Sequence, residues 1–152
     1  MKPSRLSAAG LGLVLLMASM GALALERGRT GDERPYVSGG IGQDEANALQ
    51  AERARYSLWV TTAAKGSGAY LSDVQLTIVD ARQRVVFDRA LDGPWLMVDL
   101  AAGRYTVRAA SGGEQHEAVT TVHAGDHHAM VFYFTVAADV QPAAARAASR
   151  AP

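Results

Sequence analysis

The chain of 152 residues contains no cysteine. Disulfide bonds therefore cannot hold its fold, and thiol catalysis and cysteine-ligated metal centres are excluded. The sequence also lacks the HExxH motif of zinc hydrolases and the GxSxG elbow of serine hydrolases. The residue types of a Ser-His-Asp triad are present, for example as Ser111, His116 and Asp126, but nothing in the sequence indicates a group that orients the histidine. We therefore expect no enzyme and no cofactor.

Long apolar runs are also lacking, apart from one short run in residues 1–24, MKPSRLSAAGLGLVLLMASMGALA. Lys2 and Arg5 precede this run, and small residues end the segment at Ala24, which is the plan of a secretory signal peptide. The run is too short and too often interrupted for a good membrane span. We predict export and cleavage after Ala24, with no membrane span afterwards; the alternative is an uncleaved membrane anchor.

Net positive charge is lacking as well. Without Lys2 and Arg5, the 15 basic residues fall to 13 against 15 acidic ones, a net charge of −2. Such a chain has no general attraction for nucleic acid, so we expect no nucleic-acid partner. Lys65 is then the single lysine and the other basic residues are arginines, which is typical of GC-rich bacterial genomes. Together with the export signal, this predicts a periplasmic location.

The segment GGIGQDE (39–45) raises the question of a phosphate-binding loop. A dinucleotide fingerprint would need glycine where Glu45 stands, and a P-loop would need lysine followed by serine or threonine. Asp44 and Glu45 would also repel phosphate from the helix start. We therefore interpret the glycines as a flexible turn into a helix, with Asp44 near the N-cap.

The rest of the chain divides by pattern. We expect a flexible arm over 25–42, because LERGRTGDERPYVS has no apolar period. Strong helix formers predict a helix over 43–55, with a thin apolar stripe that lies against the domain. A β-sandwich domain should span 56–137, and the tail 138–152 shows no strand pattern and should be disordered.

From Tyr56 onward the apolar period is two. It predicts seven strands, at 56–63, 74–80, 84–91, 95–100, 104–110, 116–122 and 128–136. The turns between them are short and mostly contain glycine, which favours antiparallel pairing. The predicted fold class is an all-β, seven-stranded antiparallel two-sheet sandwich, immunoglobulin-like or transthyretin-like, with one short N-terminal helix. Because the last strand is apolar on both faces, we expect it to be central or covered by the helix.

A family resemblance lies in the segment LAAGRYTVRAASGGEQHEAVTTVHAGDHHAMVFYF (100–134) and in SGAYLSDVQLTIVDARQRVVFD (67–88). The turn at Gly103, the Gly-x-Tyr-x-Val strand with Tyr105, the Gly-Gly hairpin and the aromatic last strand resemble the carboxypeptidase regulatory-like domain, a transthyretin-like (prealbumin-type) β-sandwich. With the glycine segment, the chain also resembles small exported proteobacterial proteins. The resemblance implies a fold and a compartment. The Tyr-Arg-Gly-Ser ending of the transthyretin-like hydrolases is missing.

The four histidines, His116, His123, His127 and His128, all lie within 13 residues. Imidazole suits copper and zinc. If 116–122 and 128–136 form a hairpin, His123, His127 and His128 meet at its tip. These three residues are the predicted metal ligands, for a weak site, although strand alternation would point His127 and His128 to opposite faces.

Two functions stay open. The first is a non-catalytic exported module that binds an unidentified protein partner or has a structural role, through a sheet face or an edge strand. The second is a periplasmic protein that binds copper or zinc through the His116–His128 cluster. An exposed patch of Trp59, Trp95 and Tyr133 would favour the first function, unless the helix covers it.

Overall fold

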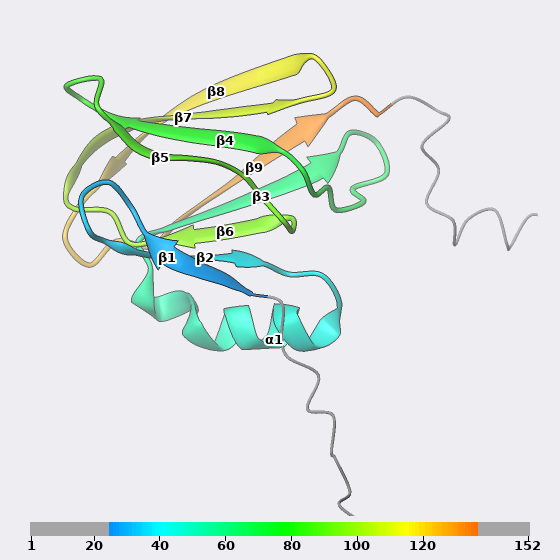
Figure 1. Ribbon diagram of the computed structural model, residues 1–152, viewed down its shortest axis with the longest axis horizontal. Coiled ribbons are helices and arrows are strands. Elements are labelled where there is room, and N and C mark those ends of the chain that lie inside the picture. Colours follow the sequence, from blue (N-terminus) through cyan, green and yellow to red (C-terminus); the bar gives the residue numbers. More distant parts are fainter. Residues whose placement is uncertain (1–24, 137–152) are drawn as a thin grey trace, which may run out of the picture.

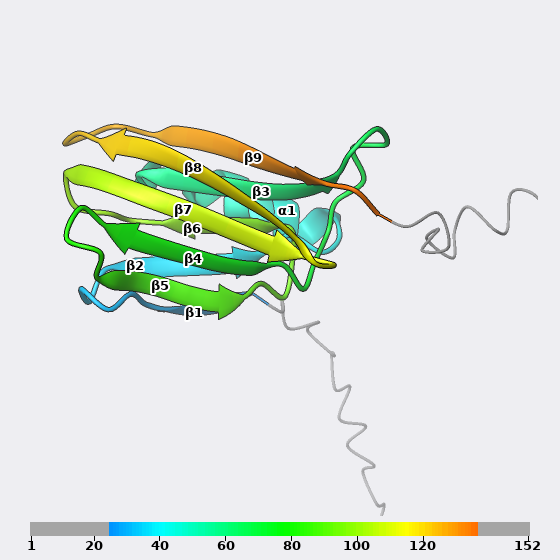
Figure 2. The same cartoon turned by 90° about the horizontal axis from the view of Figure 1, so that it is seen from above.

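The computed structural model describes residues 25–136, and these form a two-layer β-sandwich with one α-helix outside it (Figures 1 and 2). The strands are β1 (Glu26–Arg29), β2 (Pro35–Gly39), β3 (Leu58–Ala64), β4 (Gln75–Asp80), β5 (Val85–Ala90), β6 (Trp95–Val98), β7 (Gly103–Ser111), β8 (Glu114–Val122) and β9 (His128–Phe134). Helix α1 (Gln43–Glu52) continues into a 3-10 turn, η1 (Arg53–Arg55). The signal peptide and tail predicted at 1–24 and 138–152 lie outside the described residues.

The strands form a five-stranded sheet in the order β1-β2-β6-β3-β9 and a four-stranded sheet in the order β5-β4-β7-β8. The predicted strands after Tyr56 are all present, with ends that shift by at most two residues. The prediction of purely antiparallel pairing is wrong, because β3 and β9 run parallel, with Leu58 opposite His128 and Ala64 opposite Phe134. The connections from β3 to β4 and from β8 to β9 cross from one sheet to the other. The two strands that each of them joins are therefore not paired, although the connection is short.

Residues 25–42 were expected to be a flexible arm, and this expectation is wrong over β1 and β2. These two strands pair with each other, and β2 pairs with β6, so the described part of the chain has nine strands rather than seven. Tyr36 and Val37 explain why this segment is structured and not flexible: both side chains are buried, on opposite faces of the sheet. β1, with the sequence ERGR, has no apolar residue and stands at the sheet edge.

The main core lies between the two sheets and is built from alternate residues of the facing strands. Val74, Leu76 and Ile78 are fully buried there, as are Val107 and Leu96. The other large members of this core include Leu58, Val60, Phe87, Leu91, Val98, Tyr105 and Phe134. Apolar burial of this extent is the main force that holds the two sheets together.

A second, smaller core lies on the outer face of the five-stranded sheet, beneath α1. Leu49 of the helix is fully buried there against Val37, Trp95 and Met97. The expectation that the helix lies against the domain is therefore confirmed. The expectation that it covers the last strand, or that this strand is central, is wrong: β9 is an edge strand. Among residues 25–136, no helix is long and apolar enough to cross a membrane.

The glycine segment does hold an anion, but this anion is the chain's own Glu45. The buried Glu45 carboxylate accepts hydrogen bonds from the backbone N–H groups of Gly40 (3.1 Å) and Ile41 (3.0 Å). The N-cap is Gly42, which makes no side-chain capping bond, and Asp44 stands two residues after it in the first turn, near the N-cap as expected. Glu45 reaches back over the helix start as the glutamate of a capping box does.

Candidate functional site

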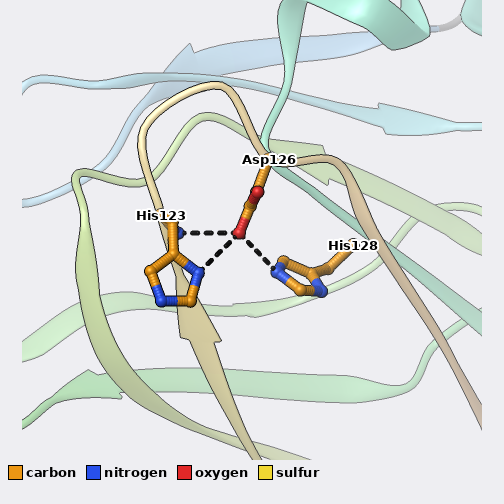
Figure 3. A group of neighbouring side chains, drawn as sticks. All are labelled: His123, Asp126 and His128. Atoms are coloured by element: carbon orange, nitrogen blue, oxygen red, sulfur yellow. Dashed lines mark hydrogen bonds and ion pairs between the residues drawn. The ribbon is translucent and has the colours of Figure 1, made fainter.

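The connection between β8 and β9 brings His123, Asp126 and His128 together (Figure 3). The Asp126 Oδ2 atom accepts hydrogen bonds from His123 Nδ1 (2.8 Å), from the His123 backbone N–H (3.0 Å) and from His128 Nε2 (3.1 Å). One potential ligand atom from each residue lies within 4.8 Å of the other two. The group is partly open to solvent, with His123 the most exposed member.

A tight turn holds this arrangement. The Asp126 N–H donates to the His123 carbonyl at 3.1 Å, and Gly125 has φ +83°, as the third position of a type II turn requires. His128 is fixed separately, because its N–H donates to Ser57 O at 2.8 Å at the start of the ladder with β3. Hydrogen bonding from the His123 ring, then from the His123 backbone and the His128 ring, lowers the pKa of the Asp126 carboxyl below its usual value.

The predicted ligand set was partly right. His123 and His128 do meet, but His127 lies apart from them, with its Nδ1 donating to Tyr56 O at 2.9 Å. The third member of the group is Asp126, which the sequence places close by but which the prediction left out of the ligand set. The expected hairpin is also absent from the described chain, since β8 and β9 belong to different sheets. A turn between the sheets, not a hairpin tip, carries the histidines.

His116 lies elsewhere on β8 and has other partners. Its Nε2 is 2.9 Å from Glu114 Oε1, and its ring packs edge-on against Phe134. Glu114 also accepts a hydrogen bond from the Thr135 N–H at 2.7 Å, which is the first cause of its lowered pKa. The Ser-His-Asp set weighed above is therefore not assembled, because His116 pairs with Glu114 while Asp126 pairs with His123.

A second candidate region is the free edge of β9. Its ladder with β3 starts at the His128 N–H and ends where Phe134 O accepts from Lys65 N (2.8 Å). Since alternate residues of a strand bond to the same neighbour, the backbone groups of Ala129, Val131 and Tyr133 point away from β3. These residues carry six such groups, one N–H and one C=O each. Within residues 25–136, β9 pairs with no strand on that side.

The side chains at this edge are apolar and exposed. Val131 and Tyr133 keep 46% and 51% of their surface, while Phe132 and Phe134 on the opposite face are buried. On the neighbouring edge strand β8, Val119 is 50% exposed. A depression of about 370 Å³ runs between the two edges, lined by Lys65, Glu114, His116, Glu117, Ala118, Val131, Phe132 and Tyr133.

The other sheet edges are protected in ways that natural proteins use against unwanted pairing. β1 is short and bears three charged residues. β5 is contacted by the β1–β2 connection, where the Gly31 N–H donates to Val86 O at 2.8 Å. β8 carries Glu114 and Glu117. In contrast, β9 bears no carboxylate, lysine or arginine.

The expected aromatic patch is not a single surface. Trp95 is buried under α1, and Trp59 is half-buried with the Arg53 guanidinium 4.4 Å from its ring centroid. Tyr133 is exposed. A separate depression of about 440 Å³ borders the histidine turn and contains the Arg34–Asp99 ion pair (2.9 Å).

The comparisons with known proteins assign no family: no family model matches the chain, and no curated protein matches it. The site must therefore be interpreted from its own geometry.

Proposed function

We propose that this domain is an exported, non-catalytic binding module that recognises an extended segment of another polypeptide along the free edge of β9. The observation that carries the proposal is the combination on one strand of unpaired backbone groups with exposed apolar side chains, at Val131 and Tyr133. Addition of a strand to an open edge uses these two features: main-chain bonds supply affinity, and pockets for alternate side chains supply specificity.

The depression between β8 and β9 supports a partner in extended conformation. A strand added beside β9 would pair with Ala129, Val131 and Tyr133, and its side chains on one face would enter the depression, where Ala118 and Phe132 offer apolar contact. Thr135 would not take part in this pairing, because its N–H already donates to Glu114. We therefore place the added strand alongside residues 129–133.

A binding role accounts for the ionisable groups better than catalysis does. Catalytic groups converge in a pocket that excludes water. Here Glu114 and His116 pair with each other at the surface, and Asp126 pairs with two histidines on an open turn. The proposed export through residues 1–24 is compatible with the fold, because cleavage after Ala24 would leave β1 complete.

The test is site-specific photo-crosslinking in the cells that naturally produce the chain. A photoreactive residue replaces the exposed Ala129, and we expect one discrete crosslinked polypeptide. Val131→Pro should abolish this product, because proline removes an N–H that points to the free edge and not to β3. The matched control is Val119→Lys on β8, a valine of similar exposure, which should keep the product.

Val131→Pro must fold for this comparison, which far-UV circular dichroism and thermal melting establish. Val131→Lys, which keeps the N–H and adds a charge to the exposed face, gives a second variant if the proline variant is unstable. A crosslinking pattern that is unchanged in Val131→Pro and Val131→Lys would contradict the proposal. Mass spectrometry of the recovered chain should show Leu25 as its first residue; a chain that still starts at Met1 would contradict export by cleavage.

A further inference from the structure

We infer that His123, Asp126 and His128 bind one divalent transition-metal ion of the zinc type, a role separate from the proposed binding edge. The donor set selects this class of ion. Two imidazole nitrogens and one carboxylate oxygen suit Zn²⁺ and Cu²⁺, whereas Mg²⁺ and Ca²⁺ prefer oxygen ligands alone. Three protein ligands leave a position of a tetrahedral ion for water or for a ligand from solution.

The distances allow an ion if the side chains adjust around it. Ligand atoms around a tetrahedral Zn²⁺ lie about 3.3 Å apart when each is about 2.0–2.1 Å from the ion. Asp126 Oδ2 is now 2.8 Å from His123 Nδ1 and 3.1 Å from His128 Nε2, so these pairs would separate by a few tenths of an ångström. The two imidazole nitrogens lie no more than 4.8 Å apart, so they would approach each other by up to about 1.5 Å.

The protonation chemistry is also favourable. Each ring now places its proton on the nitrogen that faces Asp126, since a carboxylate only accepts hydrogen bonds. A neutral imidazole can carry that proton on its other nitrogen instead, which frees the inner nitrogen's lone pair for a metal. The ion would then replace the hydrogen bonds that now join the carboxylate to the two rings.

The backbone prepares the site before an ion arrives. The Asp126 N–H bond to His123 O closes the turn, and the Asp126 carboxylate is oriented by the His123 N–H. His128 is placed by its bond to Ser57 in the sheet. Ligands from a turn and from a strand end therefore face each other without a disordered loop between them, which reduces the entropy cost of binding.

Isothermal titration of the chelator-treated, purified chain with Zn²⁺, and in a separate series with Cu²⁺, tests this inference. We expect one ion per chain at low micromolar concentration and a raised melting temperature with metal present. Asp126→Asn, His123→Ala and His128→Ala should each weaken binding at least tenfold. His127→Ala and His116→Ala are matched controls that should leave the affinity within twofold.

The controls separate this set from the one predicted by sequence spacing. If His127→Ala weakens binding as much as His128→Ala, the ligands are the three neighbouring histidines and the inferred site is wrong. If the wild-type chain binds neither ion, or if His116→Ala weakens binding equally, the inference also fails. None of these results bears on the β9 edge, whose test uses crosslinking without added metal.

Discussion

Replacing Glu45 by alanine should destabilise the domain by about 2–3 kcal/mol, because its carboxylate is the hydrogen-bond acceptor for two backbone N–H groups of the glycine segment. It accepts hydrogen bonds from the Gly40 and Ile41 N–H groups at 3.1 and 3.0 Å. A hydrogen bond to a charged group contributes about 1.5–3 kcal/mol, and an abandoned buried donor costs a similar amount. Gly40 is buried and would lose its partner, whereas the exposed Ile41 can bond to water. The expected loss therefore includes the full free energy of the Gly40 hydrogen bond and only part of that of the Ile41 hydrogen bond.

Urea denaturation followed by tryptophan fluorescence measures this loss, since Trp95 lies under α1, whose first turn contains Glu45. Glu45→Gln keeps an oxygen acceptor without the charge, so its loss should be about half that of alanine. Asp44→Asn is the matched control: this acid also stands in the first turn but is exposed, so its loss should stay below about 1 kcal/mol. An alanine variant within 0.5 kcal/mol of the wild type, taken as roughly the limit for a neutral surface change, would refute the role of Glu45.

Two further perturbations test how α1 is attached. Leu49→Ala should cost about 2–5 kcal/mol, because the fully buried leucine leaves a cavity above Trp95; a change below about 1 kcal/mol in the same urea assay would contradict this packing. The hydrogen bonds from Arg27 lower the pKa of Glu52 below 4.5, so the stability from this pair is present above that pH and is lost as the pH falls through the folded-state pKa. Arg27→Gln should flatten the acid limb of a stability–pH profile, and an unchanged limb would contradict it.

Local alternation predicted most of the sandwich because burial on one face leaves a period of two in the sequence. β4 and β7 show this, with Leu76 and Val107 buried and their chain neighbours partly exposed. β1 could not be found in this way. Its four residues ERGR are held by pairing with β2 and by the ion pairs of Glu26 and Arg27, and neither leaves an apolar pattern.

Strand partners were harder to predict than strands. Turn length reports only whether consecutive strands can pair, whereas β3 pairs with β9, about 70 residues later in the chain. The same limit applies to the histidines. Spacing placed His123, His127 and His128 together, but the direction of His127 depends on Tyr56 O, a distant group that spacing does not show.

Both candidate regions follow from the crossing of the chain between sheets after Val122. The chain leaves the four-stranded sheet there and enters the five-stranded sheet at His128, so the turn with Asp126 spans the two layers. Had β8 and β9 formed a hairpin, the two strands would have paired with each other, and the edge of β9 that points away from β3 would not be free. The shared origin does not make the two roles depend on each other. His128 is fixed at the start of the ladder with β3, while Val131 uses its backbone on the opposite side of the strand. Val131→Pro should therefore leave metal affinity unchanged, and Asp126→Asn should leave crosslinking at position 129 unchanged; a joint loss would show that β9 is rearranged as a whole.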